Sequence, residues 1–291
     1  MLQLFWALNI NAQLTINEIL FNPVKDGFDY VEIYNRSDYN VNLDELLIAN
    51  RNAANEIASV KNISKDPLTI KPGKFFVLTG NANWLKQHYK VPDSAIIVQL
   101  TLPSFADDEG CVVLLRKPDS SIIDELTYSE DWHFKMITDP QGVALEKINY
   151  ELPSQDKNNW TSASSSAGFG TPGYVNSQFR NNTLQDEEIS VLPEIFTPDN
   201  DGQNDFASIN IRTHEQGKII NAVVFDVRGR RVRYLLRNET LGADNRFNWD
   251  GYDDKDQLLP SGIYIIFMQV FDTKGSVTKY RKCVVLNSFP P

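Results

Sequence analysis

The chain has 291 residues, more than one domain usually contains, so we expect two domains. It carries 28 Lys and Arg residues against 38 Asp and Glu residues, a formal net charge of −10, which disfavours nucleic acid as a partner. With 42% hydrophobic and 11% aromatic residues, the chain can bury ordinary cores and is not a disordered polymer. The acidic surplus fits either cation binding or a solvated surface that keeps the protein soluble, and we favour the second.

The first 13 residues, MLQLFWALNINAQ, are apolar from Leu2 to Ile10 and end in the small residue Ala12 before Gln13. This pattern predicts the remnant of a secretory signal peptide, cleaved near Ala12 or Gln13, although no Lys or Arg precedes the apolar run. The alternative is a buried first strand. No other apolar run approaches the roughly 18–20 residues of a membrane span. We therefore expect no span, and a mature protein that is soluble or anchored externally.

Residues 14–150 alternate short β-type runs with turn chemistry. In DYVEIYN, Val31 and Ile33 alternate with larger polar side chains, which is the period-two pattern of a strand. KPGKFFVLTG predicts a turn and then a buried strand, and GCVVLLRKPDSSIIDELTY predicts two strands around the KPDSS turn. NANWLKQHYKVP predicts one short helix that Pro92 closes. Many short strands separated by turns favour a β-sandwich.

Residues 151–189 differ in composition from the segments on either side. SASSSAGFGTPG is small and flexible and NNTLQDEE is polar, so we expect a linker that follows the first domain and then leaves it. Residues 190–291 return to β-type patterns. NAVVFDVRGRRVRYLL predicts a hairpin with Gly229 in its turn, and GIYIIFMQVFDTKGSVTKYRKCVVL predicts two long strands around DTKG. The expected fold class is all-β, with two sandwich domains joined by a flexible linker.

Several separated blocks occur in the order of a known family. INEILFNP, DYVEIYNRSDYNVNLDELLI, KPGKFFVL and DDEGCVVLLRKPDSSIIDELTY resemble the lamin-tail domain, and GVALEKIN and NNWTSASSSAGFGTPGYVNS resemble the stretch that follows it in bacterial members. The resemblance covers roughly residues 14–176. It implies an immunoglobulin-like β-sandwich, as in nuclear lamins and many bacterial surface and secreted proteins. It also implies a binding or structural module, since that family has no catalytic site to carry over.

The second domain resembles another family through LPEIFTPDNDGQND, VVFDVRGRRV, WDGYDDKDQLLPSGIYIIFMQV and KYRKCVVL. These blocks are similar to the gliding-motility-associated C-terminal family and to the immunoglobulin-like repeat of flagellar hook-capping proteins. In the first of these families, the domain ends proteins exported by the type IX secretion system. The resemblance implies a second immunoglobulin-like sandwich, contact with the secretion machinery through this domain, and a protein that is secreted or held on the outer cell surface. VFDVRGRRV and WDGYDDKDQ look closer to the hook-capping repeat, so a structural relative of an export signal is the alternative.

The stretch FTPDNDGQND is the main candidate for metal chemistry. Calcium takes six to eight oxygen ligands, which alternate residues of a tight loop can supply. Asp199, Asp201, Asn204 and Asp205 have suitable spacing around Gly202. The alternative is a turn in which Asp and Asn side chains bond their own backbone, and we favour it. Calcium remains the candidate cofactor, and we predict no other.

We predict no catalytic residue. The three histidines, His88, His133 and His214, have no partner at a metal-ligand spacing. His133 stands beside Asp131 and Glu130 in the sole acid–histidine cluster of the sequence, and we interpret it as a loop histidine at the edge of the sandwich.

Two tyrosines are the candidates for surface binding. Tyr30 and Tyr34 share one face of a predicted strand, so exposed rings could stack on sugars or on a partner protein. The alternative, which we favour, is that both rings belong to the core and to cross-strand pairs.

The cysteines, Cys111 and Cys283, each lie in an apolar, strand-like run and in different predicted domains. We therefore expect two buried, reduced thiols rather than a disulfide.

Together these observations predict an exported, non-catalytic adhesion or structural module. Its expected partners are a protein or glycan at the cell surface and the type IX secretion machinery. One alternative is an accessory component of the secretion or gliding apparatus. A second is a small secreted hydrolase, whose acid pair is a matter of distance in space and is not visible in sequence.

Overall fold

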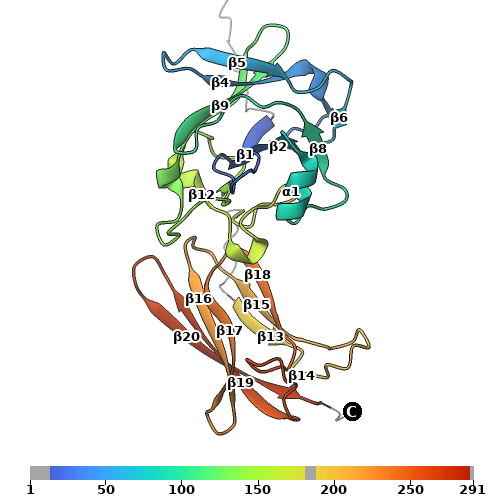
Figure 1. Cartoon of the computed structure of the whole chain (residues 1–291), viewed down its shortest axis with the longest axis vertical. Coiled ribbons are helices and arrows are strands. Elements are labelled where there is room, and N and C mark those ends of the chain that lie inside the picture. Colours follow the sequence, from blue (N-terminus) through green and yellow to red (C-terminus); the bar gives the residue numbers. More distant parts are fainter. Residues whose placement is uncertain (1–13, 181–187, 289–291) are drawn as a thin grey trace, which may run out of the picture. The chain divides into compact units, whose positions relative to one another are not determined.

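The computed structural model describes residues 14–180 and 188–288, so the predicted signal-peptide remnant at residues 1–13 lies outside the described residues. The chain divides into two compact units. Unit 1 takes Met1–Ser162 and Gly170–Asn176, and unit 2 takes Ala163–Phe169 and Ser177–Pro291. Both are built from packed β-sheets, so the predicted all-β class is confirmed (Figure 1).

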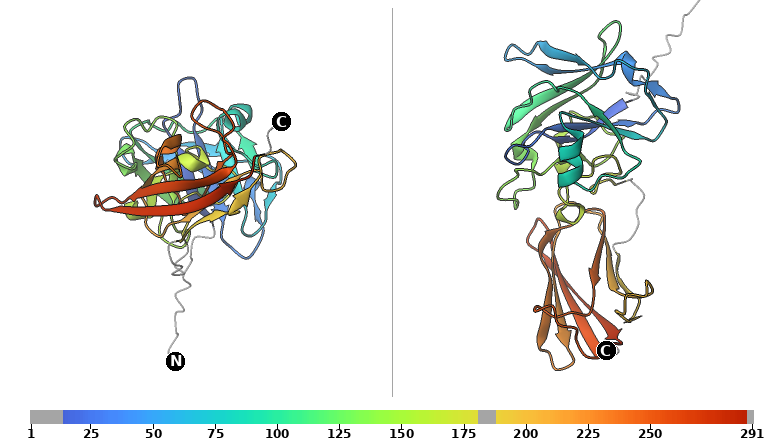
Figure 2. Two further views of the ribbon diagram at one scale, coloured as in Figure 1. Left: turned by 90° about the horizontal axis from the view of Figure 1, so that it is seen from below. Right: turned by 45° about the vertical axis from the view of Figure 1, so that its right-hand side comes forward.

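Unit 1 contains a larger and a smaller sheet that face each other across the core, and Figure 2 shows them from two further directions. Within the described residues the larger sheet runs in the order β12 (Trp160–Ser162), β11 (Leu145–Lys147), β1 (Leu14–Leu20), β2 (Tyr30–Asn35), β7 (Phe75–Thr79), β8 (Ile96–Gln99). The smaller sheet runs in the order β10 (Ile122–Ser129), β9 (Glu109–Arg116), β4 (Leu46–Arg51), β5 (Ile57–Asn62). A short ribbon pairs β3 (Val41–Asn42) with β6 (Thr69–Ile70).

The core of unit 1 follows from side-chain alternation. Ile16 of β1, Ile33 of β2 and Leu114 of β9 are fully buried in one apolar cluster between the sheets. The neighbouring positions Tyr30 and Glu32 point to the other face of the larger sheet, because successive strand residues face opposite ways. Those two are also fully buried, so this face of the sheet is covered as well.

The predicted short helix is confirmed as α1 (Ala82–His88). It begins where the Asn81 side chain accepts hydrogen bonds from the backbone N–H groups of Asn83 and Trp84, each at 3.1 Å. Trp84 and Leu85 form its buried side. Three short 3₁₀ helices also occur in the described part of unit 1: η1 (Leu43–Glu45), η2 (Glu130–Trp132) and η3 (Lys157–Asn159).

Unit 2 is a second two-layered β structure, whose layers separate clearly in Figure 1. One sheet runs in the order β13 (Glu188–Leu192), β15 (Ala207–Arg212), β18 (Asp244–Trp249). The other runs in the order β14 (Ile195–Phe196), β20 (Val277–Leu286), β19 (Gly262–Phe271), β16 (Ile219–Asp226), β17 (Arg231–Thr240). Trp249 lies fully buried between them, with its ring 5.3 Å from Phe196 and 5.3 Å from Tyr264.

Both hairpins predicted for this unit are confirmed. The turn between β16 and β17 places Gly229 at φ 75°, and the turn between β19 and β20 places Gly275 at φ 84°, a left-handed region that favours glycine. In the first turn the Asp226 carboxylate accepts the N–H groups of Arg228 and Arg230, each at 2.9 Å. Local turn chemistry thus sets these two hairpins.

The segment 151–189, for which we predicted a linker, contributes elements to both units in its described part. Strand β12 pairs with β11 at the edge of the larger sheet of unit 1. The 3₁₀ helix η4 (Ser165–Ala167) belongs to unit 2. There the Ser165 N–H donates to the Thr240 hydroxyl, and the Thr240 N–H donates to the Ser165 hydroxyl, each at 2.8 Å. Short polar side chains make these contacts, and such contacts leave no apolar period in the sequence.

Candidate functional site

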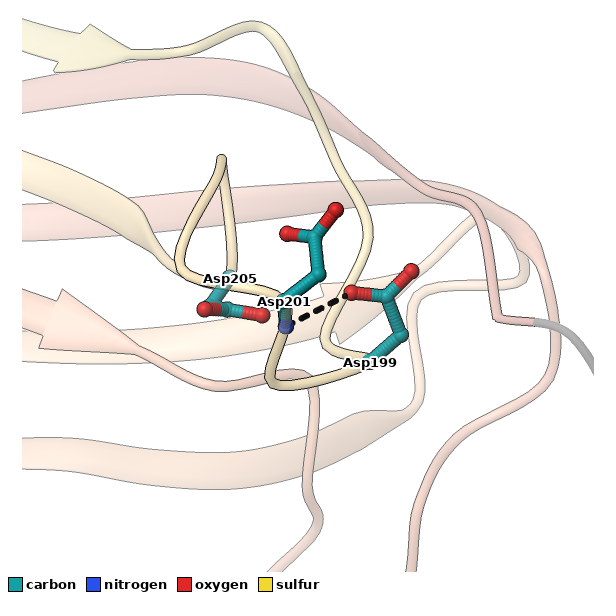
Figure 3. A group of neighbouring side chains, drawn as sticks. All are labelled: Asp199, Asp201 and Asp205. Atoms are coloured by element: carbon teal, nitrogen blue, oxygen red, sulfur yellow. Dashed lines mark hydrogen bonds between the residues drawn. The ribbon is translucent and has the colours of Figure 1, made fainter.

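Three carboxylates meet in the loop that joins β14 to β15 in unit 2 (Figure 3). Asp199, Asp201 and Asp205 each offer an oxygen atom, and these atoms all lie within 4.8 Å of one another. Asp199 and Asp201 are exposed and Asp205 is half-buried. Asn204, the fourth residue of the predicted metal site, has a left-handed φ of 56°, and its carbonyl oxygen accepts the Thr197 N–H at 2.9 Å.

The same carboxylates also fix the backbone of the loop. Asp205 accepts the N–H groups of Asn200 at 2.7 Å and of Gly202 at 3.0 Å through its two oxygens. Asp199 accepts the Asp201 N–H at 3.2 Å, the bond drawn in Figure 3. The loop therefore has the turn hydrogen bonds of one sequence interpretation and the converging oxygens of the other. Each carboxylate oxygen has a second lone pair, so a turn-forming oxygen can still ligate a cation.

The two candidate tyrosines differ in exposure. Tyr30 is fully buried and donates its hydroxyl to Glu18 Oε1 at 2.8 Å, so it lacks the exposure that stacking on a ligand requires. Tyr34 is half-buried, with ring centroids 4.8 Å from Phe75 and 4.5 Å from Tyr150. Tyr34 therefore keeps an accessible edge on a packed aromatic support.

A group of buried glutamates in unit 1 has no counterpart in the sequence prediction. Glu18 of β1, Glu32 of β2 and Glu146 of β11 are all fully buried on the face of the larger sheet turned away from its apolar core. Residues 170–176 cover them, and we call these three glutamates with that segment the carboxylate latch. Thr171 donates its N–H to Glu18 at 2.8 Å and its hydroxyl to Glu146 at 2.8 Å, and Gly173 donates its N–H to Glu32.

Burial controls the charge of the carboxylate latch. It raises the pKa of Glu18 to about 8, and the nearby charge of Glu146 adds to the increase, while the Thr171 N–H bond acts in the opposite direction. Burial, with Glu18 as the second cause, raises the pKa of Glu32 well above its ordinary value. Glu18 is thus mostly protonated at pH 7, so a neutral carboxyl makes its hydrogen bond to Thr171 of segment 170–176. No sequence signal marks these glutamates, because alternation puts Glu32 opposite the apolar core, on a face that is ordinarily solvated.

The predicted acid–histidine cluster does not form around His133. The His133 ring is buried, and its Nδ1 lies 2.9 Å from the Ser162 hydroxyl oxygen. Asp131 points elsewhere and pairs with Lys135 at 2.7 Å. Burial lowers the pKa of His133 to about 4, so the imidazole is neutral near pH 7. His133 is therefore a loop histidine, as expected, but it is buried beside Phe21.

Both cysteines are free, but only one is buried. Cys111 is buried as predicted, whereas Cys283 is exposed, which corrects the prediction of two buried thiols. The apolar run around Cys283 belongs to a two-sided strand in which Val284 faces the core and its neighbour faces outward. An apolar run alone does not tell which phase of the alternation is buried.

Comparisons with known proteins give a family for each unit. Residues 10–130 match the Lamin Tail Domain model, and residues 190–286 match the model of the CHU_C Type IX secretion signal domain. No curated protein matches the chain. None of the helices in residues 14–180 and 188–288 is long and apolar enough to cross a membrane.

Solved structures are only distantly similar. CopC from Methylosinus trichosporium OB3b is 11% identical, with 29% of this chain and 78% of that chain covered and a TM-score of 0.21. Dimeric latent PorU from Porphyromonas gingivalis is 9% identical, with 99% and 22% covered and a TM-score of 0.28. PorZ of the same organism, described as an essential bacterial surface component of its type IX secretion system, is 11% identical, with 94% and 38% covered and a TM-score of 0.25. The chain thus spans well under half of PorU and PorZ, and likenesses of this size carry no argument about function.

The two family matches agree with the division of the fold. The first ends just after β10, so β11, β12 and the segment of the carboxylate latch lie beyond the matched residues. The second spans β13 to β20, which is the full set of strands described in unit 2. The chain therefore contains a lamin-tail domain over residues 10–130 and a type IX secretion signal domain over residues 190–286, and the signal domain indicates export to the cell surface or into the medium.

Proposed function

We propose that the protein is a non-catalytic cargo of type IX secretion in which unit 1 acts outside the cell as an adhesion or structural binding module. The observation that carries this proposal is the pairing, in one chain, of a lamin-tail domain with a secretion signal domain. Neither module belongs to an enzymatic class. Unit 2 delivers the chain through its contact with the secretion machinery, and unit 1 supplies the contacts made afterwards.

Tyr34 and Phe75 are the binding surface that we assign to unit 1. Tyr34 of β2 lies directly opposite Phe75 of the neighbouring strand β7, and both rings are half-buried. Tyr150 is buried against them and limits their motion. Rigid aromatic rings with an open edge support the stacking of a sugar ring or an apolar side chain at low entropic cost. The proposed partner is a glycan or protein at the cell surface.

We propose in addition that the loop of unit 2 binds calcium through Asp199, Asp201, Asn204 and Asp205. Three carboxylates within 4.8 Å repel one another, and a divalent cation would offset that repulsion. Bound calcium would stiffen the β14–β15 connection without taking part in any reaction. Water molecules and backbone carbonyls would complete its coordination.

Cell fractionation tests the cargo proposal against its two alternatives. Cells that produce the protein are separated into medium, outer membrane and cytoplasm, and the intact mass and N-terminus of each fraction are measured. A cargo module is expected in the medium or in a surface wash, beginning near Gln13 or Leu14. Retention with outer-membrane proteins after washing would instead favour an accessory component of the apparatus. Hydrolysis of polysaccharides by the purified chain would contradict the non-catalytic assignment.

A further inference from the structure

One face of unit 2 departs from the polar exterior expected of a β-sandwich. In β19, Tyr264, Ile266 and Met268 pack in the core, so the alternate residues of this strand point outward. Ile263, Ile265 and Phe267 among them are apolar, whereas Gln269 is polar; Ile263 is 52% exposed and the other two apolar residues are half-buried. Outward positions of an antiparallel sheet are ordinarily polar, so a row of apolar side chains that are half-buried or exposed here needs a reason other than folding.

The apolar residues of neighbouring strands align with this row. Ile263 pairs with Val285, Ile265 with Phe225, and Phe267 with Val223. The rings of Phe225 and Phe267 lie 6.5 Å apart. The apolar centre of this face therefore consists of Val223, Phe225, Ile263, Ile265, Phe267 and Val285. It spans the middle three long strands, β16, β19 and β20, which are seen side by side in Figures 1 and 2.

Basic side chains border this centre. The Arg281 guanidinium lies 5.5 Å from the centre of the Phe267 ring, and the Arg237 guanidinium lies 4.0 Å from the centre of the Tyr234 ring. Lys279 follows on the same side of β20, one outward position from Arg281. Among the described residues, Arg237, Lys279 and Arg281 form no ion pair. We call the six apolar residues and these three basic residues the arginine-rimmed face.

None of the nine residues of the arginine-rimmed face is acidic, and many acidic side chains of unit 2 lie in two of its loops. One loop contains Asp199, Asp201 and Asp205, and the other runs from Asp250 to Asp256. Asp226, at the end of β16, is bound to Arg228 and Arg230 of its own turn. The arginine-rimmed face thus joins an apolar centre to an unpaired positive border. Aromatic and arginine side chains dominate the binding energy of protein interfaces, and arginines held over rings lose little freedom when they bind.

We propose that the arginine-rimmed face docks a protein of the secretion machinery whose surface has an apolar centre bordered by carboxylates. This assignment rests on the export function of unit 2 proposed above. Carboxylates are the expected partners because they can accept paired hydrogen bonds from a guanidinium already stacked on a ring. A polyanion such as nucleic acid is disfavoured by the net charge of −10. An aliphatic centre is also a poor match to a sugar chain, which presents mainly hydroxyl groups.

Substitutions on exposed side chains test the proposal in the full chain. Ile263→Asp places a charge in the apolar centre, and Arg281→Glu reverses the charge of the border. Leu192→Asp is the matched control, because Leu192 is 56% exposed on the other sheet of the same unit. Arg281→Lys keeps the charge but removes the paired hydrogen bonds of the guanidinium, so it separates the two contributions. The measurement is the fraction of each variant found outside cells that have a working type IX system.

We expect Ile263→Asp and Arg281→Glu to lower the external fraction at least tenfold. Leu192→Asp should stay within twofold of wild type, and Arg281→Lys should fall between wild type and Arg281→Glu. Thermal unfolding of the purified variants should match wild type, because the altered side chains are exposed. If Ile263→Asp fails to fold, Arg281→Glu together with Arg237→Glu carries the test, since both arginines are exposed.

Three outcomes would overturn the proposal in different ways. If the folded Ile263→Asp and Arg281→Glu chains leave the cell like wild type, the arginine-rimmed face is not the docking surface, and the export function stands. A wild-type dimer in solution that Arg281→Glu separates into monomers would assign the face to self-association. A wild-type chain that stays inside competent cells would contradict the export function itself, and the docking face with it.

Discussion

Replacing Glu18 by glutamine should make unit 1 more stable at neutral pH. The side-chain amide keeps an oxygen where Glu18 Oε1 accepts the Tyr30 hydroxyl and the Thr171 N–H, each at 2.8 Å. It places an NH₂ group where Oε2 lies 3.2 Å from the Thr171 hydroxyl. The titratable groups that interact with Glu18 are Tyr30, Glu32, Tyr89, Glu146 and Tyr174, and none of them is a cation. The amide in Glu18→Gln should therefore reproduce the protonated carboxyl without its tendency to ionise.

The size of the effect follows from the pKa of Glu18. The native group titrates at about 8 and the unfolded group at 4.5, so the native state holds the proton more tightly between these values. The stability that depends on this proton is complete below pH 4.5 and falls as the pH rises towards 8. At pH 7 the difference amounts to roughly 3 kcal/mol, taken at about 1.4 kcal/mol per pKa unit. The variant and the wild type should be equally stable near pH 4.5 and should diverge above it.

Urea unfolding of the full chain at about pH 4.5, 6 and 7.5 measures the divergence. We expect the midpoint of the unit 1 transition to rise in Glu18→Gln by an amount that grows with pH, at an unchanged denaturant slope. Asp124→Asn would not test the same point, because the Asp124 carboxylate accepts the Ile16 N–H and does not belong to the carboxylate latch. A midpoint that falls equally at all three pH values would refute the reasoning, since Glu18 would then act only as a hydrogen-bond acceptor.

Three further predictions concern both units. If the loop of unit 2 binds calcium, calcium at about a hundred times its dissociation constant should stabilise this unit by roughly 3 kcal/mol, measured by calorimetry. Asp201→Asn or a chelator should remove this gain, and a wild-type unfolding temperature that calcium leaves unchanged would contradict the site. Gly170→Ala should lower the free energy of unfolding of unit 1 in urea by about 1–3 kcal/mol, because a Cβ there would lie 2.7 Å from atoms of both Tyr30 and Tyr89. Gly262→Ala is the control and should have little effect, because its Cβ would meet nothing closer than 4.0 Å. Maleimide should modify Cys283 long before Cys111, whose burial raises its pKa to about 11, and mass spectrometry showing equal rates would contradict this exposure pattern.

Local chemistry made much of the fold predictable. The helix at 82–88 begins at an Asn cap, and the hairpins of unit 2 turn at Gly229 and Gly275, so short-range signals located them. The carboxylate latch depends instead on Thr171 and Gly173, far along the chain from the glutamates they contact. Nothing within one strand marks such a partner.

The sequence also did not show which face of each strand is buried. Tyr30 and Tyr34 face the same side of β2, as alternation indicates, yet one is buried by segment 170–176 and the other lies at a half-open edge. Cys283 and Val284 stand next to each other in one apolar run, and only the second enters the core. Apolar composition identifies a strand, but the sheet packed against it decides which face is buried.

The central claim is that unit 2 carries the protein out of the cell by type IX secretion. The most direct measurement compares the location of the full chain in cells with a working type IX system and in otherwise identical cells that lack it. The account predicts protein in the medium or on the surface of the first cells and retention inside the second. Protein found outside both cell types, or inside both, would contradict the claim.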